Sequence, residues 1–111
     1  MKLGLVQYSP IWENPEESVL KIESLIKFSN NKFDLLIFPE MTLTGFTMNS
    51  EKFAEEIDGT GTQYFLNLSA HLKTNIFAGI IERDGENIYN SLVHFDSFGL
   101  IRARYRKIHP F

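Results

Sequence analysis

Two charged side chains stand where catalytic residues of α/β proteins are commonly found. Glu40 follows the apolar stretch of residues 35–38 after a single proline, Pro39. Ligands of open α/β sheets bind at the carboxyl ends of parallel strands, and a carboxylate held there is suited to general-base chemistry. Lys107 ends a second β-like stretch, has the opposite charge and lies 67 positions further along the chain. The two form a catalytic pair only if the elements around them bring them together.

The corner at Glu40 has two interpretations. In the functional one, the carboxylate is a general base at the edge of the sheet, Pro39 fixes the turn and Gly45 allows a tight loop. In the other, Glu40 is an ordinary loop acid exposed to solvent. The pattern of neighbouring residues leaves both open.

The case for Lys107 rests on the alternation of side chains along a strand predicted to begin at residue 100. Successive side chains of a strand point to opposite faces. One face therefore comprises Leu100, Arg102, Arg104 and Arg106, and the other comprises Ile101, Ala103, Tyr105 and Lys107. Three arginines predict a solvent face, so Lys107 is expected on the inward face, where an ammonium group needs a partner or a shifted pKa. The alternative is that the strand ends before Lys107 and its ammonium group lies in solvent.

The first half of the chain predicts a β-α-β unit. Residues 3–8 and 34–38 are expected to form short buried strands. Between them, Asn14 and Pro15 are typical of the N-cap and first position of a helix. Apolar residues then recur at helical spacing until Asn30 and Asn31. This order predicts two parallel, neighbouring strands in an α/β fold.

The second half predicts a long loop, a helix and three strands. Residues 39–60 are expected to be irregular with one helical turn near 51–56, and loops of this length are usually functional or disordered. A helix is predicted over residues 60–73, and strands over 75–82, 88–95 and 100–106. Asp84-Gly85 predicts a hairpin turn, and Gly99 ends a second turn.

Composition excludes several classes of function. The 111 residues fit a single domain, and the formal net charge of −3 argues against nucleic-acid or anionic-membrane partners. No apolar run is long enough to span a membrane, and the N-terminal apolar stretch is too short for a signal peptide, which favours a cytoplasmic location. The three histidines have no metal-ligand spacing, so we expect no metal and no cofactor. The chain contains no cysteine.

An ordered set of motifs resembles the nitrilase superfamily of carbon–nitrogen hydrolases. The set comprises Gln7 after the first strand, Phe38-Pro39-Glu40, Thr44-Gly45-Phe46, Tyr89-Asn90-Ser91, Gly99 and Tyr105-Arg106-Lys107-Ile108-His109. It spans essentially all 111 residues. The resemblance implies an α-β-β-α sandwich of which residues 1–111 are the N-terminal part, because members of the superfamily are considerably longer.

The resemblance also assigns roles to the two charged residues. Glu40 matches the general base of the superfamily, and Lys107 matches the lysine that stabilises the tetrahedral intermediate. The third member of this Glu-Lys-Cys triad, the nucleophilic cysteine, is expected beyond position 111, as is a second glutamate. The implied activity is an amidase that cleaves a small carboxamide, in a homo-oligomer.

A finer resemblance concerns the loop of residues 44–49, which is similar to that of omega-amidases. These enzymes hydrolyse monoamides of 2-oxo dicarboxylic acids. Phe46 and Met48 are expected to line the substrate pocket, with simple packing of the loop as the alternative. His109 is expected to form a structural hydrogen bond near Lys107.

Two other functions stay open at this point. The chain is either part of an active amidase or a catalytically inactive module for interaction or dimerisation. The same scaffold also supports nitrile hydrolysis and acyl transfer, because a fold does not determine the reaction. Half of a two-sheet sandwich would leave an apolar face exposed, which predicts self-association.

Overall fold

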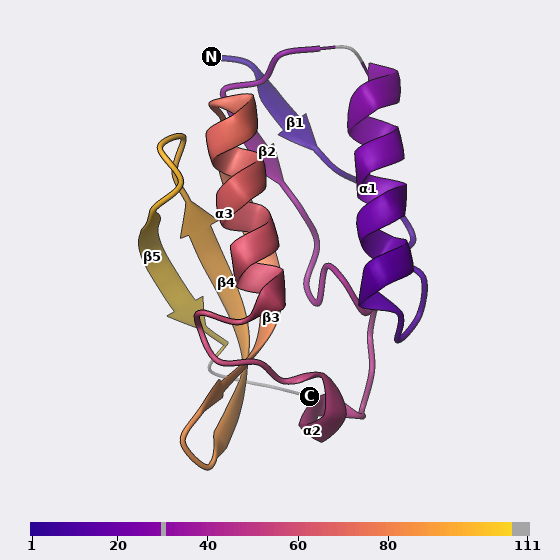
Figure 1. Cartoon of the computed structure of the whole chain (residues 1–111), viewed down its shortest axis with the longest axis vertical. Helices are drawn as coiled ribbons and strands as arrows, with labels where there is room; N and C mark the ends of the chain where they lie inside the picture. The colour runs from indigo at the N-terminus through magenta and orange to yellow at the C-terminus, as the bar shows by residue number, and fades with distance from the viewer. Residues whose placement is uncertain (30, 108–111) are drawn as a thin grey trace.

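The structure, a computed structural model, describes residues 1–29 and 31–107. Its strands form a single sheet in the order β1-β2-β3-β4-β5, so that every strand lies beside its neighbours in the sequence (Figure 1). The strands are β1 (Leu3–Leu5), β2 (Leu35–Ile37), β3 (Asn75–Asp84), β4 (Asn87–Phe95) and β5 (Ile101–Arg106). The helices are α1 (Pro15–Ser29), α2 (Ser50–Phe53) and α3 (Thr60–Leu72). The helix end expected at Asn30 and the role expected for His109 lie outside the described residues.

The predicted β-α-β unit is confirmed. β1 and β2 pair in parallel, and β2 pairs in parallel with β3. Helix α1 begins where expected, because the Asn14 side-chain oxygen accepts a hydrogen bond of 3.1 Å from the N–H of Glu17. β1 is shorter than predicted, although the N–H of Val6 still donates to the carbonyl of Ile37 at 2.8 Å.

The second half is an antiparallel meander, as predicted. β3 and β4 pair from Ile76↔Phe95 to Asp84↔Asn87, and Gly85 at the turn has a φ of 62°. β4 and β5 pair next, after a turn in which Gly99 has a φ of 80°. Both turns use glycine because a positive φ is costly for other residues. The helical turn expected near residues 51–56 is α2.

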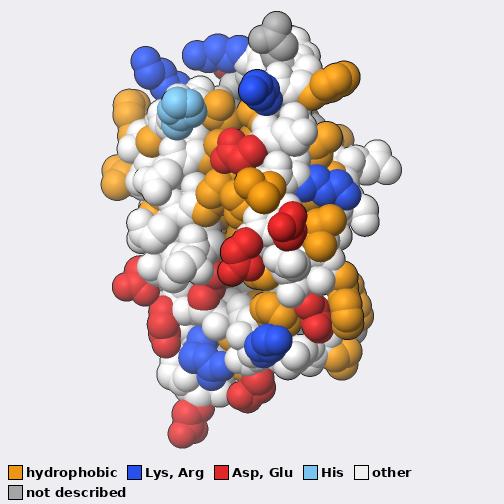
Figure 2. Space-filling view, turned by 45° about the vertical axis from the view of Figure 1, so that its right-hand side comes forward, with side chains coloured by type: hydrophobic (Ala, Val, Ile, Leu, Met, Phe, Trp, Pro, Cys, Tyr) orange, Lys and Arg blue, Asp and Glu red, His pale blue; other side chains and the backbone are white. Residues whose placement is uncertain are grey.

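Helices α1 and α3 lie on the same side of the sheet (Figure 1). The core between them and the strands centres on Phe65, which is fully buried. Its ring centroid lies 5.5 Å from that of Phe38 and 5.6 Å from that of Phe95. The two helices leave a cavity of about 450 Å³ over β1 and β2, and Figure 2 shows apolar side chains at the surface among charged ones on the α1 side.

The other side of the sheet is not covered by any described helix, and this corrects the assignment of faces in β5. Tyr105, expected to point inward, is 56% exposed, and its partner Leu92 on β4 is 43% exposed. Of the arginines expected in solvent, Arg102 is 65% exposed, whereas Arg104 and Arg106 lie on the helix side and bind the buried Glu82. Alternation correctly predicted which residues share a face. It did not reveal which face the helices cover.

None of the helices in residues 1–29 and 31–107 has the length and apolar character needed to cross a membrane.

Candidate active site

The Glu40 corner is tied to the middle of β3 by Thr42, which is fully buried. The Thr42 hydroxyl donates to the carbonyl of Pro39 at 2.6 Å and accepts from the N–H of Gly79 at 2.9 Å. The N–H of Thr42 donates to the carbonyl of Gly79 at 3.1 Å. The Tyr8 hydroxyl donates to the carbonyl of Thr42, and burial raises the pKa of Tyr8, which keeps it a neutral donor. The backbone on both sides of Glu40 is therefore fixed by several hydrogen bonds.

Gly79 allows this corner to approach the sheet. A Cβ atom at position 79 would lie 2.6 Å from the backbone nitrogen of Met41 and 2.8 Å from the Cα of Glu40. Both distances are too short for real carbon contacts, and both involve backbone, so only glycine fits. Sequence reasoning missed Gly79, although a glycine inside an apolar strand is a known signal of close backbone approach. At the other end of the loop, Gly45 has a φ of 72°, in agreement with the tight loop expected there.

The structure brings Glu40 and Lys107 together, across 67 positions of sequence. The Lys107 Nζ lies 3.4 Å from the Glu40 Oε1. The other carboxylate oxygen, Oε2, accepts a hydrogen bond of 3.2 Å from the side-chain amide of Asn90. The three side chains thus come from three elements: the loop after β2, strand β4 and the end of β5.

Lys107 continues the ladder of β5 by one residue. The strand itself ends at Arg106, as the alternative interpretation had it, but the N–H of Lys107 still donates to the carbonyl of Asn90 at 2.9 Å. The Lys107 side chain is 36% exposed and that of Glu40 is 63% exposed. An ion pair that is this open to water stabilises a fold little. The contact therefore contributes little to the stability of the fold.

A small cavity of about 190 Å³ adjoins the Asn90 side of the cluster. Its walls combine side chains of the loop after Glu40 with those of β3 and β4, and they include Met41, Thr47, Met48, Ile81, Tyr89 and Asn90. Met48 is 74% exposed at this wall. Phe46 lines a more open hollow beside Trp12, whose indole N–H donates to the Phe46 carbonyl at 2.7 Å. That Phe46 and Met48 bind substrate stays a prediction.

Acid–base groups dominate the chemistry of this cluster. Among residues 1–29 and 31–107, no group of three or more histidines, cysteines, aspartates or glutamates is arranged to hold a metal ion. A carboxylate with one oxygen held by an amide and the other facing an ammonium group can accept a proton from a nearby nucleophile. The ammonium group can stabilise negative charge that develops beside it.

Comparison with known proteins decides the family. Residues 2–111 match the family model for carbon–nitrogen hydrolases. The chain belongs to the carbon–nitrogen hydrolase family. The resemblance to the nitrilase superfamily is thereby confirmed.

Two relatives of this chain illustrate the range of named activities in the family. The chain is 32% identical over 117 residues to a nitrilase of Pyrococcus abyssi, with 100% of the chain and 44% of the relative covered. It is 30% identical over 112 residues to the 2-oxoglutaramate amidase of Bacillus subtilis, with 98% of the chain and 43% of that enzyme covered. The chain therefore spans less than half the length of these relatives.

A solved structure confirms the fold. The carbon–nitrogen hydrolase superfamily protein XC1258 of Xanthomonas campestris superposes on the chain with a TM-score of 0.90 at 26% identity. The match covers 100% of the chain and 42% of XC1258. The five-stranded sheet with its two covering helices is thus the N-terminal portion of the nitrilase-type fold.

Proposed function

We propose that the protein to which this chain belongs cleaves a small carboxamide, with Glu40 as general base and Lys107 as the cation that stabilises the tetrahedral intermediate. The observation that carries the proposal is the contact of both residues, together with Asn90, at the carboxyl end of β2. The family assignment supports hydrolysis of a carbon–nitrogen bond. The roles of the individual residues are those that the resemblance to the nitrilase superfamily implies, and the contact between them supports these roles.

The proposed reaction begins with transfer of a proton from a thiol to Glu40. We assign the thiol to a cysteine outside these 111 residues, because the chain itself contains none. The thiolate attacks the amide carbon, and the oxyanion that forms lies against Lys107. Glu40 returns the proton to the departing nitrogen, which leaves as ammonia. A water molecule, deprotonated by Glu40, then hydrolyses the thioester and releases the carboxylic acid.

Asn90 supports this cycle by holding the Glu40 Oε2 at 3.2 Å. With that oxygen occupied, Oε1 is the oxygen that exchanges protons on the Lys107 side. The resemblance of residues 44–49 to omega-amidases, and the relative named 2-oxoglutaramate amidase, favour a monoamide of a 2-oxo dicarboxylic acid.

A panel of substrates tests the proposal. Ammonia release is measured for the protein purified from its natural source, with 2-oxoglutaramate, other monoamides and the matching nitriles. We expect turnover of at least one monoamide and faster turnover of amides than of nitriles. Nitriles as the preferred substrates would favour the alternative suggested by the relative named nitrilase. No ammonia from any of these compounds would refute hydrolysis.

A catalytically inactive interaction module is the second candidate. The apolar side chains exposed on the uncovered side of the sheet, such as Leu92 and Tyr105, support it because they favour association. The intact mass of the purified protein separates the two candidates. A mass near 12.9 kDa would support the inactive module, and a mass more than twice as large would support the amidase.

A further inference from the structure

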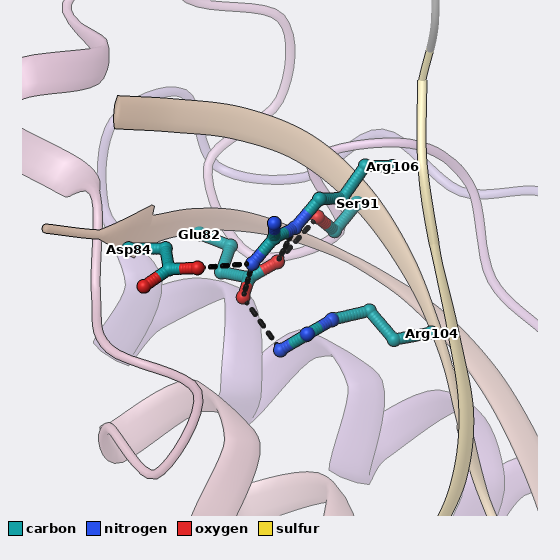
Figure 3. A network of polar contacts seen from close by, with 5 residues as sticks. All are labelled: Glu82, Asp84, Ser91, Arg104 and Arg106. Atoms are coloured by element: carbon teal, nitrogen blue, oxygen red, sulfur yellow. Dashed lines mark hydrogen bonds and ion pairs between the residues drawn. The ribbon is translucent and has the colours of Figure 1, made fainter. Parts of the chain in front are cut away.

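A buried carboxylate lies on the helix side of the sheet, behind the candidate active site. The Glu82 side chain is 1% exposed. It accepts hydrogen bonds from the Ser91 hydroxyl at 2.8 Å, from Arg104 at 2.8 Å and from Arg106 at 3.2 and 2.9 Å (Figure 3). Arg106 also binds Asp84 at 2.8 Å. The carboxylate therefore joins β3, on which it lies, to both β4 and β5.

The residues bound by Glu82 are the immediate neighbours of the site residues. Ser91 follows Asn90 in β4, and Arg106, the last residue of β5, precedes Lys107. Ser91 and Arg106 are paired directly across the two strands. Since successive side chains point to opposite faces, anchoring this pair on the helix side directs Asn90 and Lys107 to the other side, toward Glu40.

The contacts of Glu82 with Ser91, Arg104 and Arg106 depend on its negative charge. Burial alone would raise its pKa, but hydrogen bonds from Arg106 and Ser91 and the positive charge of Arg104 lower the pKa below its ordinary value. A neutral glutamine would keep one acceptor oxygen and turn an amide donor toward an arginine. Some of the hydrogen bonds that Arg104 and Arg106 of β5 donate to residue 82 would then be lost.

We propose that Glu82 is a positioning residue of the candidate active site. It sets the register of β4 against β5 and thereby holds Asn90 and Lys107 at their distances from Glu40. Its effect on turnover rests on the proposed amidase function, whereas its effect on the geometry does not. The proposal adds to the catalytic pair a residue that touches none of the reacting atoms.

The β4–β5 hairpin contains a matched control at its other end. Asp96 is also buried, accepts hydrogen bonds from the N–H groups of Phe98 and Leu100 at 2.9 and 3.0 Å, and pairs with Arg102 at 3.3 Å. It lies in the turn that joins the same two strands, six positions from Asn90. Asp96→Asn therefore destabilises the hairpin without disturbing the end that carries the site.

The test compares Glu82→Gln with Asp96→Asn in the full protein. Two readouts do not depend on activity: hydrogen exchange at the Lys107 amide and the NMR signal of the Asn90 side-chain amide. For Glu82→Gln we expect hydrogen exchange at the Lys107 amide to become faster than in the wild type. Exchange at the Phe38 amide, whose N–H donates to the carbonyl of Phe77 in β3, should change less, and the Asn90 signal should shift. We also expect kcat to fall about 10- to 100-fold with KM little changed, because small misplacements of catalytic groups are costly. Asp96→Asn should lower Tm and leave all of these unchanged.

The outcomes separate this inference from the proposed function. Equal losses of kcat in the two variants at equal loss of Tm, or an unmoved Asn90 signal in Glu82→Gln, would overturn the positioning role. If the wild-type protein releases no ammonia while the two geometric readouts still change, the proposed function fails and the positioning role stands. Should Glu82→Gln not fold, Ser91→Ala removes one donor only, and the same changes are expected at smaller size. Unchanged readouts in a folded Ser91→Ala would then count against the proposal.

Discussion

Two glutamates on opposite sides of one sheet are held very differently. Glu82 is 1% exposed and receives hydrogen bonds from a serine and two arginines, all but one at 2.9 Å or less. Glu40 is 63% exposed, and its two hydrogen bonds measure 3.2 and 3.4 Å. The tightly held carboxylate stabilises the fold, whereas the loosely held one is open to water. The number of contacts around an acid therefore does not single out Glu40, the residue that we propose as the base.

The difference follows from which side of the sheet the helices cover. α1 and α3 lie over one side, and there an acid must be paired because burying an isolated charge is costly (Figure 1). The side that carries Glu40 has no described helix over it. Its ionic contacts are open to water and weak, and its apolar side chains, such as Tyr105, are exposed.

Glu40→Gln should give the largest effect on activity and almost none on stability. We expect turnover to fall about 10³- to 10⁴-fold, because the variant cannot accept a proton in either half of the reaction. The free energy of unfolding should change by less than about 0.5 kcal/mol, as for other exposed positions. Ammonia release and urea unfolding measure the two quantities. A variant that unfolds more easily would show that Glu40 is mainly structural.

Lys107→Met should reduce turnover by about 10²- to 10³-fold, the usual cost of losing one preorganised group beside a developing oxyanion. The methionine keeps the length of the side chain and removes its charge. Lys73→Met is the control, since Lys73 lies in the C-cap of α3, away from the cluster. A loss of similar size in both variants would refute the specific role of Lys107.

Glu82→Gln, unlike Glu40→Gln, should clearly destabilise the fold. We expect it to lower the free energy of unfolding by about 2–3 kcal/mol, near the lower end for a broken buried ion pair, because the arginine partners are partly exposed. Urea unfolding with detection by circular dichroism measures the change. Equal stability of the two glutamine variants would contradict the view that Glu82 stabilises the fold more than Glu40 does.

Gly79→Ala should disturb the Glu40 side of the sheet by forcing the corner away from β3. The added Cβ would meet backbone atoms of Met41 and Glu40 below 3 Å, so we expect a loss of about 1–3 kcal/mol, typical of overpacking. The matched control is Gly85→Ala, where a Cβ would meet no atom within 4 Å but the φ of 62° is strained. Loss of turnover is expected for Gly79→Ala alone, and its absence would show that the corner can shift without harm.

The buried Glu82 and the half-buried Glu55 should change the stability of the fold in opposite directions as the pH changes. Glu82 has a lowered pKa, so its contribution is complete above the ordinary value of 4.5 and is lost as the pH falls through the lower folded value. Glu55 has a pKa raised chiefly by burial, so its contribution declines as the pH rises from 4.5 toward the raised value. The stability difference between wild type and Glu82→Gln should therefore shrink on acidification. A difference that does not vary with pH would contradict the assignment.

Much of the fold followed from local patterns. Asn14-Pro15, the helical spacing of apolar residues and the Asp84-Gly85 turn each act over a few positions, so the sequence alone predicts them. The alternation of faces in the last strand suggested Lys107 as a partner for Glu40, and the resemblance to a family gave both residues a role. The burial of Glu82 was not predicted, because an acid after an apolar run is normally exposed and its arginine partners lie 22 and 24 positions away. The covered side of β5 was assigned wrongly for the same reason, since coverage depends on distant elements.

The central claim is that Glu40, and not the better-held Glu82, is the base of the reaction. Its most direct test is ammonia release by Glu40→Gln and Glu82→Gln, measured side by side and normalised to the folded fraction of each. The account predicts at least a tenfold greater loss in Glu40→Gln, although that variant is the more stable of the two. Near-normal turnover of Glu40→Gln, or a greater loss in Glu82→Gln, would contradict it.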